Sequence, residues 1–162
     1  MSQKILRNIS VAALMLCVLA SCSNVKKVVL GEKKTELILT IKAERDVNPD
    51  DNGRSSLVYL NLYELRTGKT FPTVSYINLL QGGPASLGVD LVSNARLDAI
   101  LPGTERQEKM VLDATTNHLG VSAELVQYEN INTKVLIDIV PNKTNNVVLV
   151  VGKYGLKYSL KE

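Results

Sequence analysis

The sequence predicts a mainly β protein, an antiparallel β-sandwich with a small inserted helical element. Eight short segments between residues 35 and 160 have the composition of β-strands. Proline, glycine and asparagine turns separate nearly all of these segments. One stretch, at about 73–92, follows a helical period instead. Many short strands at this spacing are typical of a two-layer sandwich.

The first two expected strands differ in how they should be buried. Residues 35–43 alternate between apolar and mostly polar side chains, so this strand should be buried on one side. Residues 57–65 are apolar on both faces apart from Asn61 and Glu64, as in a strand at the centre of a layered structure. The buried face of the first strand would consist of Leu37, Leu39, Ile41 and Ala43. The other strands are expected at 95–101, 109–113, 119–128, 134–140, 146–152 and 154–160.

The helical element is expected between two of these strands. Val74, Ile77 and Leu80 recur at the spacing of one helix face. Two glycines then end this stretch, and Pro84 stands where a new helix would begin. An irregular crossover connection is the alternative interpretation of the same segment.

Residues 1–21 have the parts of a secretory signal peptide that ends at a lipoprotein processing site. Two basic residues precede an apolar run from about 9 to 19, and small Ala20 and Ser21 lead to Cys22. A helix needs roughly 20 apolar residues to cross a bilayer, more than this run provides. A membrane-spanning or buried helix is the alternative interpretation.

Lipoprotein processing would make Cys22 the first residue of the mature chain. Its thiol would carry a diacylglycerol and its amino group a further acyl chain, and we expect no other cofactor. Two or more acyl chains hold a protein durably on a bilayer. Because Ser23 is not the aspartate that resembles an inner-membrane retention signal, we expect the periplasmic face of an outer membrane. Lys26 and Lys27 could instead simply touch anionic headgroups.

The mature chain is expected to divide into a lipidated tether, residues 22–34, and one sandwich domain, residues 35–162. In an alternative arrangement, residues 28–30 pack on the domain and shorten the tether. Loss of the two basic residues of the signal lowers the net charge from +3 to +1. A nearly neutral chain with one phenylalanine and no tryptophan lacks the basic charge and the aromatic residues that nucleic-acid-binding proteins use. No free thiol would remain, because Cys17 leaves with the signal and Cys22 is acylated.

No sequence motif points to catalysis. The only histidine, His118, lies at an expected strand start without a local partner for a general base, and we expect it at the surface. The sequence contains no nucleophile elbow, phosphate-binding glycine loop or metal-ligand cluster. We therefore expect no enzymatic activity and no metal. A peptidoglycan hydrolase is the enzymatic alternative, which would be recognised by cleavage of cell wall.

Residues 46–56 combine turn-forming residues with charge. Asn48, Asp50 and Asn52 match the first half of a calcium-binding loop, but the twelfth position is Tyr59 instead of glutamate. The proline and glycine of this segment favour a long exposed turn without a metal. Binding residues often lie on exposed loops of rigid scaffolds, so this loop is the leading surface for a partner.

Six short motifs follow one another in order along the chain. They are Asn48-Pro49-Asp50, Gly53-Arg54-Ser55-Ser56-Leu57-Val58, Leu62-Tyr63-Glu64-Leu65, Ala85-Ser86-Leu87-Gly88-Val89-Asp90-Leu91, Leu101-Pro102-Gly103 and Leu119-Gly120-Val121. In this order they resemble the TssJ family, the outer-membrane lipoproteins of the bacterial type VI secretion system. The chain departs from the family at Ser55 and Ser56, where prolines are common, and at Glu64, where glutamine is frequent.

The resemblance to TssJ implies a transthyretin-like sandwich that binds the periplasmic C-terminal part of the inner-membrane protein TssM. A TssL-like component would belong to the same complex. The family's contact lies in the loop between the first two strands. Here its residues are Asp46, Val47, Asn48, Pro49, Asp50, Asp51, Asn52, Gly53, Arg54, Ser55 and Ser56. The charged residues would provide specificity, and Val47 and Pro49 would provide apolar anchoring.

A second function class stays open, a lipoprotein that binds a glycan, a small ligand or another protein. An exposed aromatic platform would favour it, and the six tyrosines are the residues able to form one. Alternation along the strands predicts instead that most of them are half-buried. They are Tyr59, Tyr63, Tyr76, Tyr128, Tyr154 and Tyr158.

Overall fold

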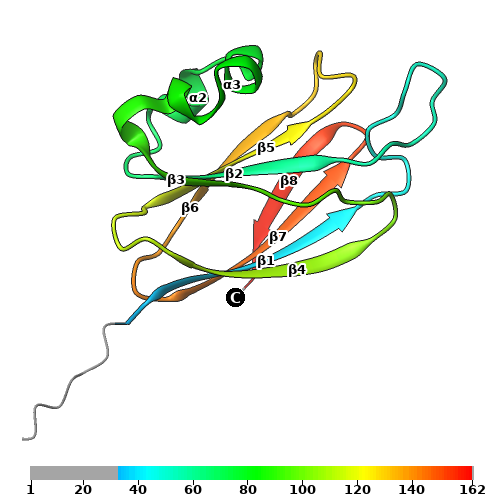
Figure 1. Ribbon diagram of the computed structural model, residues 1–162. Helices are drawn as coiled ribbons and strands as arrows, with labels where there is room; N and C mark the ends of the chain where they lie inside the picture. The colour runs from blue at the N-terminus through cyan, green and yellow to red at the C-terminus, as the bar shows by residue number, and fades with distance from the viewer. Residues whose placement is uncertain (1–32, 162) are drawn as a thin grey trace, which may run out of the picture. The chain divides into compact units, whose positions relative to one another are not determined.

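The computed structural model describes residues 33–161 of the chain, so Cys22 and the expected signal peptide lie outside the described residues. The described residues form two four-stranded β-sheets, with short helices beside one of them (Figure 1). The prediction of a mainly β sandwich with an inserted helical element is therefore confirmed. None of the short helices in this part of the chain could cross a bilayer.

The two sheets have the strand orders β4-β1-β7-β8 and β3-β2-β5-β6. The first sheet consists of β1 (Thr35–Ala43), β4 (Glu105–Leu112), β7 (Thr144–Gly152) and β8 (Gly155–Leu160). The second consists of β2 (Tyr59–Leu65), β3 (Leu91–Arg96), β5 (His118–Glu124) and β6 (Lys134–Asp138). The helical segments are α2 (Thr70–Thr73), α3 (Tyr76–Gly82) and the 3-10 segment η1 (Gly83–Asp90).

One strand pairing departs from the expected antiparallel arrangement. β1 runs parallel to β7, and the other pairings of the two sheets are antiparallel. The starts of β1 and β7 therefore lie at the same end of the sandwich. Local alternation cannot reveal this, because parallel and antiparallel strands share the same side-chain period.

The core between the sheets is built from the alternating side chains of the strands. The inward face of β1 is at most 6% exposed, as the alternation predicted: Leu37, Leu39, Ile41 and Ala43. β2 occupies a central position in its sheet, also as predicted. Leu60 and Leu62 face the core, whereas Tyr63 and Leu65 belong to a second apolar cluster beneath the helices.

The helices cover the outer face of the second sheet. Leu79 of α3 and Leu87 of η1 pack with Phe71 of α2 in this second cluster. The Phe71 ring lies over Gly120 of β5, where an added Cβ would be 2.7 Å from ring atom Cε2. Glycine at this position is what allows the helical element to approach the sheet.

Two charged side chains hold the helical element to the sandwich. The Asp90 carboxylate accepts hydrogen bonds from the backbone N–H of Thr67 at 2.7 Å and of Thr70 at 3.2 Å. From β6, Lys134 Nζ donates to backbone carbonyls at the end of α2, including that of Phe71 at 2.8 Å. Asp90 thereby joins the end of the element to its beginning, and Lys134 joins α2 to β6.

The helical element begins slightly earlier than the sequence predicted. It extends over residues 70–90 rather than about 73–92. Pro72 makes the first helix hard to recognise, because proline breaks a helix interior. It is tolerated here because the first turn of a helix has no partner for its N–H groups.

The predicted strand at 95–101 is wrong. β3 ends at Arg96; beyond it the N–H of Leu97 donates to the carbonyl of Leu60, and Ile100 forms an isolated bridge with Val58. Ile100 is 2% exposed and faces the core from an irregular connection. Its burial, not strand pairing, accounts for the apolar character of this segment.

β4 begins at Glu105, earlier than the expected start at 109. Its first half is charged, and Arg106 forms an ion pair with Glu108 at 3.0 Å. β4 lies at the edge of its sheet, where charged side chains discourage pairing with other chains. The apolar pattern of the sequence therefore marks only the second half of this strand.

Candidate functional site

The predicted loop, residues 46–56, lies in the connection from β1 to β2. It projects beyond the sheets at the end of β1 that is opposite to Thr35 (Figure 1). Six of its residues are exposed: Asp46, Asp51, Asn52, Gly53, Arg54 and Ser55. The surface that the loop offers to a partner is therefore polar, and aspartates supply most of its charge.

Asp50 organises the tip of the loop. Its Oδ1 accepts the backbone N–H groups of Asn52 at 2.9 Å and Arg54 at 2.8 Å, and its Oδ2 pairs with the Arg54 guanidinium at 2.8 Å. These interactions, led by the backbone hydrogen bond from Arg54, lower the pKa of Asp50. Gly53 has φ of +75°, a conformation that glycine adopts without strain. The tip is thus ordered by its own contacts before any partner arrives.

Val47 and Asn48 belong to the interior rather than to the partner surface. Val47 is 0% exposed and packs in the core, so it cannot provide the apolar anchoring predicted for it. Asn48 is 5% exposed, with φ of +46°. Its side chain donates to the carbonyl of Leu57 at 2.9 Å and accepts from the N–H of Val126 at 2.7 Å. The alternation of β1 does not continue here, because Arg45 is exposed and the neighbouring residues 47 and 48 are both buried, so the sequence did not reveal this burial.

Sequence reasoning missed two segments that lie beside the loop. Gln127 follows β5, and Lys153 lies in the turn between β7 and β8. Together with Asp46, Asp51 and other loop residues they line a shallow cavity of about 250 Å³. No sequence signal links these segments, because the sandwich topology alone brings them together.

His118 is half-buried rather than fully at the surface. Its Nε2 lies 3.4 Å from Asp138 Oδ1, with 26% of the side chain exposed. Its ring packs against the backbone of Gly68. Among residues 33–161, no group of three histidine, cysteine or acidic side chains is placed to hold a metal ion.

The six tyrosines divide into three groups, of which only Tyr59 is half-buried as the alternation predicted. Tyr63 and Tyr76 are buried, and the hydroxyl of Tyr76 donates to the carbonyl of Ala123 at 2.9 Å. Three others are more exposed than the alternation predicted, and they lie in separate elements: Tyr128, Tyr154 and Tyr158.

The family model of the type VI secretion lipoprotein, VasD, EvfM and TssJ, matches residues 35–154. This chain belongs to that family. The match covers nearly all of the sandwich, including the loop and the helical element. The comparison with curated proteins gave no match.

Solved structures agree with this TssJ-family fold. The chain is similar to the T6SS lipoprotein TssJ1 from Pseudomonas aeruginosa, with a TM-score of 0.75 and 24% identity over 80% of this chain and 98% of that chain. Serratia marcescens Lip, a membrane-bound component of the type VI secretion system, is similar with a TM-score of 0.70 and 17% identity, over 77% of this chain and 97% of that chain. A chain in the structure of the T6SS protein TssM C-terminal domain from EAEC has a TM-score of 0.64 and 20% identity, over 77% of this chain and 98% of that chain. At these identities the likeness establishes the fold.

Proposed function

We propose that this chain is an outer-membrane lipoprotein that binds the periplasmic C-terminal region of a TssM-like inner-membrane protein. In this role it attaches the type VI membrane complex, with a TssL-like component, to the outer membrane. Membership of the TssJ family supports the proposal. The activity is mechanical attachment, so no catalytic turnover and no metal is required.

One structural observation carries the proposal: the lipid end and the loop end of the molecule are the two ends of β1. The tether enters at Thr35, and the loop begins shortly after Ala43. β1 lies inside its sheet, with β4 on one side and β7 on the other. A pull between membrane and partner is therefore directed along a strand that is hydrogen-bonded on both edges.

This geometry suits a load-bearing link. β1 pairs with β4 from Thr35 to Lys42 and with β7 from Glu36 to Ala43. Because both ends of the pull act on β1, the tension passes along the covalent backbone of a strand that is already extended, and the hydrogen bonds to β4 and β7 are not pulled open. The buried side chains of β1 keep the strand in its place under such tension, because moving them would expose apolar surface.

The membrane end of the proposal depends on Cys22, which lies outside the described residues. A diacylglycerol on its thiol and an acyl chain on its amino group would provide durable anchoring. Mass spectrometry of the protein extracted from membranes tests this point. The expected result is a mature N-terminus at Cys22 that carries three acyl chains, and an unmodified Cys22 would contradict it.

The partner end depends on the exposed residues of the loop. Asp51 is exposed at the tip and takes part in no ion pair with another described residue. It can therefore be changed without disturbing the Asp50 and Arg54 contacts that order the loop.

A titration with the purified periplasmic region of the TssM-like protein tests this contact. We expect Asp51→Lys to weaken binding at least tenfold. Asp138→Lys is the matched control, because Asp138 is 87% exposed and belongs to β6, outside the loop. Equal affinities of the two variants would show that the loop is not the contact.

A further inference from the structure

The end of the sandwich opposite to the loop carries a cluster of lysines around the start of β1. Lys33 and Lys34 precede Thr35, and the backbone N–H of Glu36 donates to the carbonyl of Lys143 at 3.0 Å. The parallel register of β1 and β7 thus brings Lys143 beside the point where the tether enters. All three lysines are exposed, and none forms an ion pair with another described residue.

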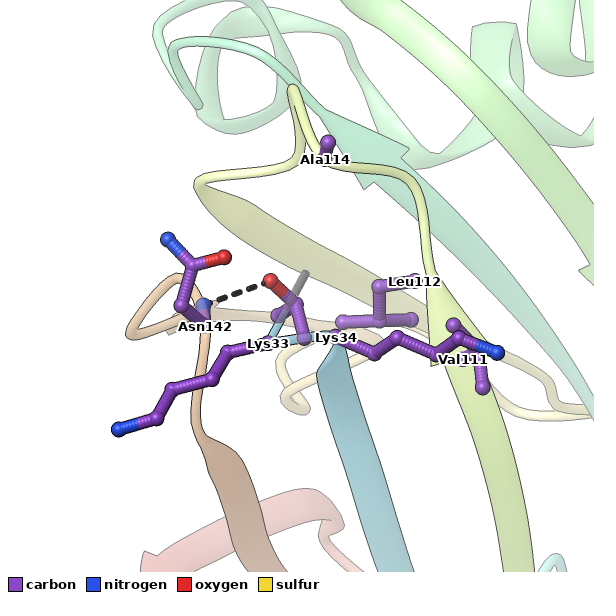
Figure 2. Close-up of a pocket in the computed structure, with 7 residues that line it drawn as sticks. Lys33, Lys34, Val111, Leu112, Ala114 and Asn142 are labelled. Atoms are coloured by element: carbon purple, nitrogen blue, oxygen red, sulfur yellow. Dashed lines mark hydrogen bonds between the residues drawn. The ribbon is translucent and has the colours of Figure 1, made fainter. Parts of the chain in front are cut away.

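An apolar rim adjoins these lysines. The antiparallel register of β1 and β4 places Leu112 opposite Thr35, and the neighbouring Val111 is 57% exposed. A cavity of about 600 Å³ opens here, and its lining contains two lysines and no acidic residue. Figure 2 shows the side chains of Lys33 and Lys34 leaving the chain in opposite directions, with that of Lys34 toward Val111.

The acidic side chains at this end contact other residues, and none of those that the structure describes forms an ion pair with these lysines. The Glu36 carboxylate accepts a hydrogen bond from Thr144 at 3.1 Å, and that of Asp113 accepts from Thr115. Asp138 faces His118. The three lysines are therefore a local basic patch that forms no ion pair with an acidic side chain among residues 33–161, whereas aspartates dominate the loop at the other end.

We propose that this lysine end rests on the anionic phospholipid headgroups of the membrane in which the chain is anchored. The inference rests on the proposed acylation of Cys22. Residues 23–32 separate Cys22 from Lys33, and ten residues span at most about 35 Å. The anchor thus keeps the lysines near the headgroups at high effective concentration.

The contact would orient the protein. Each lysine close to an anionic surface strengthens binding by roughly 1 kcal/mol, which corresponds to about fivefold. The aspartates of the loop are repelled by the same surface. The loop therefore faces away from the membrane, toward a partner that arrives from the inner membrane.

Vesicle flotation tests the proposal without the anchor. The mature chain with Cys22→Ser lacks acyl chains, so any binding comes from the protein surface. We expect it to float with vesicles of phosphatidylcholine and phosphatidylglycerol, to stay unbound with phosphatidylcholine alone, and to dissociate at high salt. Absence of binding to the anionic vesicles overturns the proposal.

A pair of charge-matched variants locates the contact. Lys33→Glu with Lys34→Glu should weaken vesicle binding at least 25-fold. Lys153→Glu with Lys157→Glu changes the charge equally, but Lys153 lies beside the loop, and this variant should bind within about threefold of the parent. Equal loss in both variants means that net charge alone acts, and the proposal is then wrong.

Hydrogen exchange distinguishes a membrane contact at this end from a contact with another protein or a second copy of the chain. Protection of residues 33–36 and 109–112 should appear with anionic vesicles. Protection that appears only with the TssM-like domain, or only at high protein concentration, would make this end a protein interface and overturn the proposal. The flotation results depend neither on acylation of Cys22 nor on binding of the loop to the TssM-like domain. A result that contradicts the proposed function can therefore be distinguished from one that contradicts the lipid contact.

Discussion

The side-chain oxygen of Asn48 accepts a hydrogen bond from the backbone N–H of Val126 at 2.7 Å, across 78 residues of sequence. The same side chain donates to the carbonyl of Leu57. One amide thereby joins both ends of the candidate loop to the segment that follows β5. The proposed partner surface is thus held in place by a residue that is itself only 5% exposed.

Replacement of Asn48 by glycine should release the loop. Glycine tolerates the positive φ, so the variant removes the two hydrogen bonds with little backbone strain. Leaving a buried N–H and carbonyl unpaired costs about 1–3 kcal/mol in free energy of unfolding. Urea denaturation measures this loss, and a weaker affinity for the TssM-like domain should accompany it. Asn52→Gly is the control; its side chain is exposed, so stability should change by less than about 0.5 kcal/mol.

Val47→Ala separates a core role from a contact role. The side chain is fully buried, and removing two methyl groups should lower the free energy of unfolding by about 2 kcal/mol. Affinity for the partner, measured where the variant is folded, should stay within twofold of the parent. A large loss of affinity for the partner without a loss in free energy of unfolding would show that Val47 contacts the partner.

Gly120→Ala should loosen the helical element. The new methyl group would meet the Phe71 ring, so we expect a loss of about 1–3 kcal/mol from overpacking. Phe71→Leu in the same chain should recover part of the loss, because the smaller side chain leaves room. A double-mutant cycle measures this coupling, and strictly additive effects would argue against the contact.

Asp90 makes stability depend on pH in the acid range. Burial raises its pKa, but hydrogen bonds from Thr67 and Thr70 outweigh burial, and the pKa lies below its usual value. The folded state therefore binds this proton less readily than the unfolded state. The stabilisation is complete above the unfolded pKa of about 3.9 and is lost as the pH falls through the folded pKa.

The Asp90→Asn variant isolates this contribution from those of other carboxylates. At pH 7 it should lose about 2 kcal/mol in free energy of unfolding, because the charged acceptor is gone. The difference from the parent should shrink below about pH 4. Urea titrations at several pH values measure it, and a constant difference across this range would exclude the assignment.

Local sequence patterns predicted the parts of the fold that depend on near neighbours. The alternation at 35–43 gives the bounds and the buried face of β1. The helical element was predicted at about the right place but with the wrong face, because Leu80 is 41% exposed and α3 buries Tyr76 and Leu79 instead. β4 was only half recognised, because its charged half lies at a sheet edge. The prediction at 95–101 failed because Ile100 is buried without being in a strand.

The candidate site was predicted in position but not in composition. The turn residues of 46–56 locate the loop, because proline, asparagine and glycine act on the backbone where they stand. Whether Val47 or Asp51 faces a partner depends on what packs against the loop. Gln127 and Lys153 enter the same surface through strand pairings far away in the sequence.

By itself, the sequence determined the strand-rich domain, the exposed turn and the prediction of a lipid anchor at Cys22, since each arises from residues adjacent in the chain. The tertiary structure decided that β1 and β7 run parallel, that Asn48 joins the loop to Val126, and that Lys143 lies beside the tether. These relationships follow from register between distant strands. Register is fixed by the burial of a whole face, which no short segment specifies alone.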